Sequence, residues 1–185
     1  NSTGSALSTL TFNGAGTNSI TALTMGSVTL SGATATGGSQ ATLNNAGSAV
    51  TTVGTLTMSS NAANAAVATS TAATSTINVS GGSLSVTNDL TMSTTSQNAN
   101  NSSTGTISIT GGTLTVGGNI AYTNGLGTES NTVTLDGGTL DMTNGDIGSA
   151  AAVVTFNAMS GTLKNLAHLN GGTTTLTKTS VGTLT

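Results

Sequence analysis

The stretch that decides the fold is TISITGGTLTV, residues 106–116. On either side of the Gly111-Gly112 pair, apolar residues alternate with Thr or Ser. Alternation with a period of two is typical of a β-strand that buries one face. Glycine adopts positive φ angles that other residues resist, so the pair predicts a sharp corner between two short strands.

Two further stretches repeat this pattern: TINVSGGSLSV at residues 76–86 and TVTLDGGTLDM at residues 132–142. In each copy a polar turn and a third short apolar segment follow. The glycine pairs lie about 30 and then about 26 residues apart, a spacing that indicates a solenoid. The predicted structural corners are Gly81, Gly82, Gly111, Gly112, Gly137 and Gly138.

One repeat cannot bury its apolar face alone, whereas stacked repeats bury it against one another. The sequence therefore predicts an all-β fold, a parallel β-helix (β-solenoid) with coils of about 26–34 residues and three short strands per coil. We expect stacked aliphatic side chains to form its core ladder: Leu84, Leu114, Leu140, Leu90, Ile120 and Ile147.

Weaker copies flank these repeats, such as TVGTLTM at residues 52–58. The long polar tracts 59–75 and 93–105 predict loops that project from one corner. We interpret residues 1–185 as a single β-solenoid domain, with the clearest repeats at 76–148. Because the sequence begins at Asn1 rather than Met, we expect a processed form or a fragment of a longer chain.

The composition narrows the possible functions. Only 4% of the residues are charged, against about 25% in an ordinary soluble domain. With two basic residues there is no basic patch, so nucleic acid is a poor partner. No apolar run approaches the length of a membrane-spanning helix. The scarcity of trypsin-like cleavage sites favours an exposed location outside the cell.

Two segments resemble the autotransporter-associated β-strand repeat: GGTLTVGGNI at residues 111–120 and LTKTSVGTLT at residues 176–185. That family starts a strand with Gly-Gly-Thr-Leu and carries the signature Leu-x-Lys-x-Gly-x-Gly-Thr-Leu-x-Leu. Lys178 and Gly182-Thr183-Leu184 fit the signature, while Ser180 stands where the family prefers Gly. The resemblance implies a right-handed β-helix in a secreted bacterial surface protein, and it carries no catalytic residues.

Three acidic residues recur every five positions in the third repeat: Asp136, Asp141 and Asp146. Carboxylates at turns are typical Ca²⁺ ligands, so these are the candidates for a calcium site. The equivalent positions of the other repeats are mostly Ser, Thr or Asn, unlike a Ca²⁺ ladder that recurs in each coil. His168, the single histidine, has no partner at a spacing that predicts catalysis. We therefore expect no enzyme activity and no cofactor.

Thr-x-Thr pairs occur along the chain, with the central residue expected to face inward and both Thr outward. Such pairs could form a regular array of hydroxyl and methyl groups, as ice-binding proteins use, although Thr is also simply the best polar strand former. The pairs are Thr9-Leu10-Thr11, Thr55-Leu56-Thr57, Thr113-Leu114-Thr115, Thr175-Leu176-Thr177 and Thr183-Leu184-Thr185.

These patterns lead to one functional hypothesis and two alternatives. The first is a secreted structural protein of the bacterial cell surface, a segment or subunit of a fibre that self-associates through strand pairing at its ends. The alternatives are an adhesin passenger that acts as a stalk and an ice-binding solenoid. Cell-surface or matrix glycans are the other partners that we expect.

Overall fold

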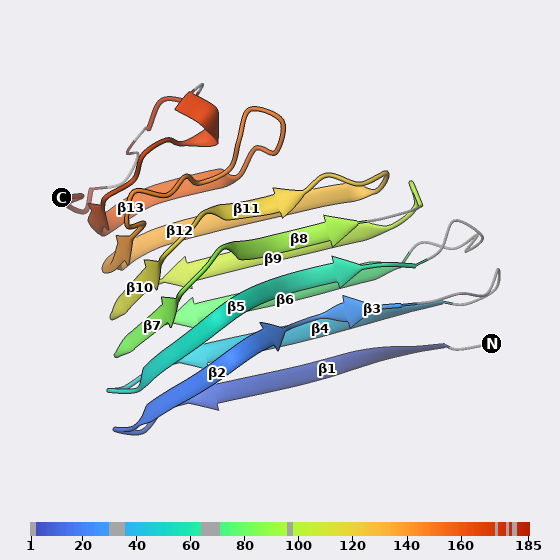
Figure 1. Cartoon of the computed structure of the whole chain (residues 1–185), viewed down its shortest axis with the longest axis horizontal. Helices are drawn as coiled ribbons and strands as arrows, with labels where there is room; N and C mark the ends of the chain where they lie inside the picture. Colours follow the sequence, from blue (N-terminus) through green and yellow to red (C-terminus); the bar gives the residue numbers. More distant parts are fainter. Residues whose placement is uncertain are drawn as a thin grey trace.

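The computed structural model of the chain describes residues 3–29, 36–63, 71–95, 98–172, 174–176, 178 and 181–185. Every strand pairing among these residues is parallel, and the strands stack into a β-solenoid from β1 to β13 (Figure 1). The all-β solenoid predicted from the glycine-pair repeats is confirmed. Positions Thr177, Thr179 and Ser180 of the terminal repeat-like segment lie outside the described residues.

The strands form three rows along the stack. Row A consists of β1 (Thr3–Phe12), β4 (Thr36–Asn45), β6 (Ala72–Val79), β9 (Ser102–Ile109), the first part of β12 (Thr128–Asp141) and the first part of β13 (Thr155–Lys164). Row B consists of the starts of β2 (Thr17–Thr24) and β5 (Val50–Asn61), then β7 (Ser83–Val86), β10 (Thr113–Val116) and the ends of β12 and β13.

Row C consists of the end of β2, β3 (Ser27–Val28), the end of β5, β8 (Leu90–Thr95) and β11 (Ile120–Thr123). Single bridges at Ile147 and Leu169 continue this row. The third strand expected around Ile147 is therefore only a bridge, because Thr143 and Asn144 turn the preceding chain through positive φ angles. A short 3-10 turn, η1 (Asn170–Gly172), follows.

The apolar residues of all three rows meet in the interior. Leu84, Leu114 and Leu140 lie in register across β7, β10 and β12, and Leu163 extends this ladder. Leu90, Ile120 and Ile147 form the matching ladder in row C, which continues upstream to Leu56. All six core-ladder residues predicted from the sequence are fully buried.

The glycine pairs differ in how they form the corner between rows A and B. Gly82 and Gly112 have positive φ angles of 59° and 62°, whereas in the third pair the positive angle of 111° falls on Gly137. There the chain stays in β12 through the corner instead of forming a turn. A Cβ on Gly82 would lie 2.1 Å from the carbonyl oxygen of Ala49 in the coil below.

The coils shorten along the chain. Stacked residues are 33 positions apart between Thr11 and Asn44 but only 22 apart between Asp146 and His168. The range of coil lengths predicted from the sequence, 26–34 residues, is therefore too narrow, because the later coils lose residues at their corners and outer loops. The solenoid is wide at its N-terminal end and narrow at its C-terminal end.

The long polar tracts are shorter loops than predicted. Much of 59–75 and 93–105 belongs to the ends of β5 and β8 and to the starts of β6 and β9. The prediction of loops over the whole of both tracts is wrong because their Ser and Asn side chains point inward and bond to other coils. Residues 64–70 and 96–97 of these tracts lie outside the described part.

Candidate functional site

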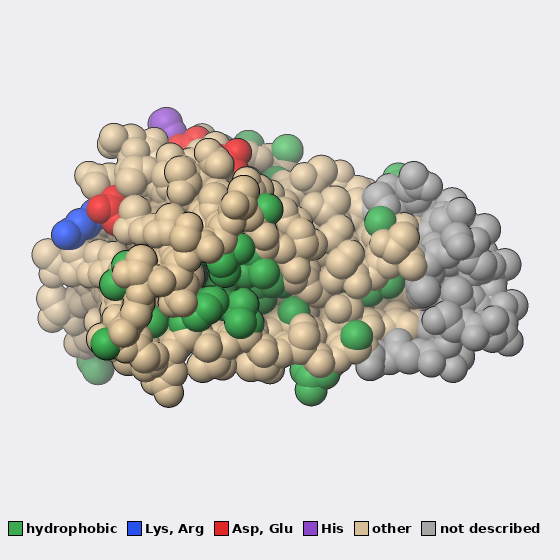
Figure 2. Space-filling model, turned by 60° about the horizontal axis from the view of Figure 1, so that its bottom comes forward, with side chains coloured by type: hydrophobic (Ala, Val, Ile, Leu, Met, Phe, Trp, Pro, Cys, Tyr) green, Lys and Arg blue, Asp and Glu red, His purple; other side chains and the backbone are tan. Residues whose placement is uncertain are grey.

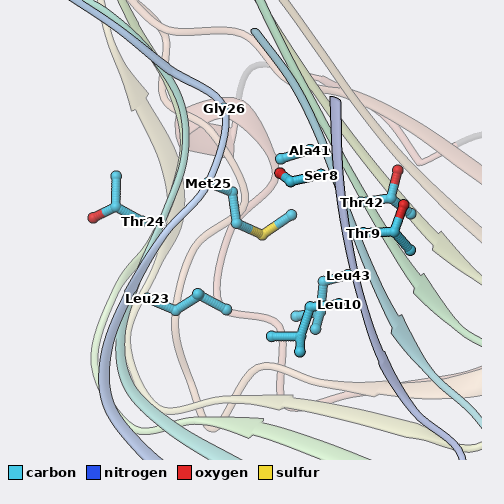
Figure 3. Close-up of a pocket in the computed structure, with 10 residues that line it drawn as sticks. All are labelled: Ser8, Thr9, Leu10, Leu23, Thr24, Met25, Gly26, Ala41, Thr42 and Leu43. Carbon is cyan, nitrogen blue, oxygen red and sulfur yellow. The ribbon is translucent and has the colours of Figure 1, made fainter. Parts of the chain in front are cut away.

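The N-terminal end of the solenoid is open. β1 pairs with β4 on one side, and no described strand pairs with its other edge. A cavity of about 150 Å³ opens between β1, β2 and β4, and Leu10, Leu23, Met25 and Leu43 point into it (Figure 3). Figure 2, with this end turned forward, shows hydrophobic side chains grouped at its centre. Within the described residues, no coil covers the side of the first coil on which this cavity lies.

Charge is distributed very unevenly along the stack. Residues 1–88 contain no Asp, Glu, Lys, Arg or His, and Asp89 is the one charged residue before Glu129. The remaining charged side chains belong to the last coils, where Figure 2 shows them at one side of the molecule. Charges along a strand edge oppose pairing with another chain, so the two ends of the solenoid differ in their capacity to pair.

The three candidate calcium ligands are not brought together. Asp136 accepts a hydrogen bond from the hydroxyl of Ser160 at 2.8 Å, at the corner between rows A and B. Asp141 ends β12, and Asp146 lies at the next corner, between rows B and C. No group of three or more potential metal ligands occurs in the described part of the chain. The five-residue spacing of the sequence places each carboxylate at a different point of the coil.

Asp146 and His168 belong instead to a polar ladder on the corner between rows B and C. Asp89 Oδ1 accepts from the backbone N–H of Asn119 at 2.7 Å, and Asn119 Oδ1 accepts from that of Asp146 at 2.8 Å. Asp146 Oδ1 lies 2.9 Å from His168 Nδ1. We call these four residues the corner ladder. Their side chains link consecutive coils, which is a structural use of groups that the sequence singles out for chemistry.

Asp141 also joins two coils. It accepts a hydrogen bond from Asn165 Nδ2 at 2.8 Å and from the backbone N–H of Thr143 at 3.1 Å. The Asn165 bond, followed by the Thr143 bond, lowers the pKa of Asp141 below its ordinary value of 3.8, and the nearby Lys164 acts in the same direction. A carboxyl with a lower pKa in the folded chain stabilises it above the unfolded pKa, and this contribution is lost as the pH falls through the folded value.

Replacement of Asn165 with glycine should raise the pKa of Asp141 towards 3.8. Glycine removes the amide donor and still accepts the positive φ of 53° at this position. An NMR titration of the Asp carboxyl resonances measures the change. Asn144→Gly is the control, because Asn144 also has a positive φ but its side chain makes no hydrogen bond to Asp141. Equal titration of Asp141 in wild type and Asn165→Gly would contradict this assignment.

Sequence reasoning missed a buried polar cluster at the corner between rows C and A. The hydroxyl of Ser103 donates to the carbonyl of Ser59 at 2.6 Å, and Thr71 donates to Asn101 Oδ1 at 2.8 Å. Asn101 Nδ2 in turn donates to the carbonyl of Ala63 at 3.0 Å. The large majority of buried polar side-chain atoms in proteins are hydrogen-bonded, as these are. In the sequence, the only sign of this cluster is Ser or Asn at the inward positions of the strands. Because a strand is recognised by apolar residues at those positions, such stretches are predicted to be loops.

The Thr-x-Thr pairs do not form one array. Thr9 and Thr11 lie in row A, Thr55 and Thr57 belong to row C, and Thr113 and Thr115 to row B. The column through Thr115 passes from Ser85 to Asp141, so it contains a charge. Thr183 and Thr185 lie near a single bridge at Leu184. The local motif therefore does not identify the face on which Thr residues align.

The fold and its two unlike ends define a parallel β-solenoid protein in which the corner ladder and Asp141 join consecutive coils. Neither a protein-family model, nor a curated protein, nor a solved structure matches the chain. Among the described residues, no helix has the length and apolar character needed to cross a membrane.

Proposed function

We propose that the chain is a structural segment of an extracellular bacterial surface fibre, extended by strand pairing at the N-terminal end of the solenoid. The observation that carries this proposal is the open first coil, with an unpaired β1 edge beside an apolar cavity. An edge without charge is a template for a further strand. Stacking another coil on β1 would continue the backbone ladder and bury Leu10 and Leu23, which are still partly exposed.

The taper determines what kind of coil fits there. A coil that covers the first one must match its length of about 33 residues, as Asn44 matches Thr11. The last coils of this chain are shorter, with 23 positions between Thr134 and Asn157. Head-to-tail stacking of copies would thus place a narrow coil on a wide one. Pairing between two N-terminal ends leaves no such mismatch but closes a dimer. Pairing with a wide coil of a neighbouring subunit also leaves no mismatch, and it is the arrangement that continues a fibre.

The same taper supports the alternative of a stalk in an adhesin passenger. In that case the same polypeptide would supply a coil of equal width before β1, and the narrowing coils would form one end of a rod. The resemblance of residues 111–120 and 176–185 to autotransporter repeats favours a setting of this kind. The two functions differ in whether the matching coil comes from another chain or from the same one.

The charge variant Leu7→Lys should prevent self-association. Leu7 is 77% exposed on the outward side of β1, and a lysine on an edge strand opposes pairing with another strand. We expect sedimentation velocity to show concentration-dependent association of the wild-type chain and monomers for Leu7→Lys. Raising the salt concentration should leave wild-type association intact, because few charges take part.

Leu126→Lys is the matched control. Leu126 is also an exposed leucine, at 69%, but it lies in the loop between β11 and β12. This variant should associate like the wild type. A wild-type chain that stays monomeric at all concentrations would reject the fibre subunit in favour of the stalk, and equal loss in both variants would reject β1 as the pairing edge.

A further inference from the structure

Row A carries an unbroken column of outward-facing threonines. Register places one Thr of each strand directly over that of the next, from β1 through β13. Figure 1 shows these strands side by side along the stack, and in Figure 3 Thr9 and Thr42 point away from the interior. We call this set the Thr column: Thr9, Thr42, Thr76, Thr106, Thr132 and Thr155.

A second polar column runs beside it, two residues further along each strand. It is composed of Thr11, Asn44, Asn78, Ser108, Thr134 and Asn157, which we call the side column. Its amides bond along the stack: Asn44 Nδ2 donates to Thr11 at 3.2 Å, and Asn78 Nδ2 donates to Asn44 Oδ1 at 2.9 Å. These bonds hold Thr11, Asn44 and Asn78 in one orientation.

The hydroxyls of the Thr column are not used in the same way. Within the described residues, none of the six makes a side-chain hydrogen bond to another residue, whereas the neighbouring Asn side chains do. The branched Thr side chain has few χ1 rotamers, so its methyl and hydroxyl groups are held in a limited set of positions. The column therefore presents ordered hydrogen-bonding groups that remain free for a ligand.

The spacing of this face is regular in two directions. Neighbouring strands lie about 4.8 Å apart, and residues two apart on one strand lie about 6.6 Å apart. Both repeats are close to the distances between oxygen atoms on a prism face of hexagonal ice. Neither column contains a charged residue, which would hold its own hydration shell, or an aromatic ring of the kind that stacks on sugars.

The other rows lack this combination. In row B the side chains of the corresponding column differ in size, and the last two are charged. This column runs through Thr52, Ser85, Thr115, Asp141 and Lys164. In row C the column of Thr24, Thr57 and Thr91 is interrupted by Ala121. We propose that the Thr column and the side column of row A together form a binding face for the surface of an ice crystal.

The test is growth of single ice crystals in the presence of the purified 185-residue chain, read by microscopy and nanolitre osmometry. The wild-type chain should produce faceted crystals and a gap between melting and growth temperatures. Thr106→Lys, at the centre of the Thr column, should abolish both effects. Thr115→Lys, at the corresponding depth of row B, should retain them. Circular dichroism and the unfolding midpoint show whether each variant is folded.

Three outcomes would overturn the proposal. Wild-type protein that is folded but leaves ice as unfaceted discs has no ice-binding face. Equal loss of faceting in folded Thr106→Lys and Thr115→Lys would show that the effect does not come from row A. Retention on crystalline cellulose without any effect on ice would assign the face to a polysaccharide instead. None of these outcomes depends on fibre formation, because crystal shaping is read at protein concentrations at which sedimentation velocity shows monomers.

Discussion

Gly82→Ala should lower the free energy of unfolding by about 2–5 kcal/mol. Gly82 has a φ of 59°, which costs an L-residue energy, and its missing side chain leaves room for the coil below. A Cβ would meet the carbonyl oxygen and the amide nitrogen of Ala49 at 2.1 and 2.8 Å. Because these are backbone atoms, the corner itself must shift. Equilibrium urea unfolding followed by circular dichroism measures the change.

Gly14→Ala is the matched control for this prediction. A Cβ at Gly14 would have no atom within 4 Å, and the φ angle there is not in the positive region. The variant should change the free energy of unfolding by less than about 0.5 kcal/mol. If Gly82→Ala were as mild as Gly14→Ala, coils at this corner would not stack as closely as described.

Leu114→Ala should be comparably destabilising, at about 2–5 kcal/mol. Leu114 is fully buried between Leu84 and Leu140, so its removal leaves a cavity in the middle of the ladder. The coils on both sides lose a contact, since each coil is stabilised mainly by its neighbours. Leu126→Ala is the control, because Leu126 is exposed and its loss should cost less than about 0.5 kcal/mol. If Leu114→Ala and Leu126→Ala had the same midpoint of urea unfolding, Leu114 would not be packed in a ladder of buried leucines.

The middle of the fold could be predicted from the sequence because two signals coincide there. In residues 76–142, strict alternation identifies the inward face, and each glycine pair fixes where the strand turns. Leu84, Leu114 and Leu140 then align without further information. Towards the N-terminus the glycine pairs disappear from the corners, and the strands of the first coils can be placed only from their register.

Two features could not be predicted, and both depend on that register. The buried cluster around Ser59, Asn101 and Ser103 bonds across residues about 40 positions apart, so its polar side chains look like loop residues in a single strand. The Thr column depends on coil lengths that change from 33 residues between Thr9 and Thr42 to 23 between Thr132 and Thr155, which no fixed repeat reveals. The Thr-x-Thr motif is visible in the sequence but spreads over three rows.

The pairing of coils at β1 is tested most directly by cryo-electron microscopy of the wild-type chain at a concentration where it associates. The proposal predicts particles in which the strand spacing of about 4.8 Å continues through the junction, with β1 at the centre of the contact. A junction formed by the last coils, or by the outer faces of the rows, would contradict it.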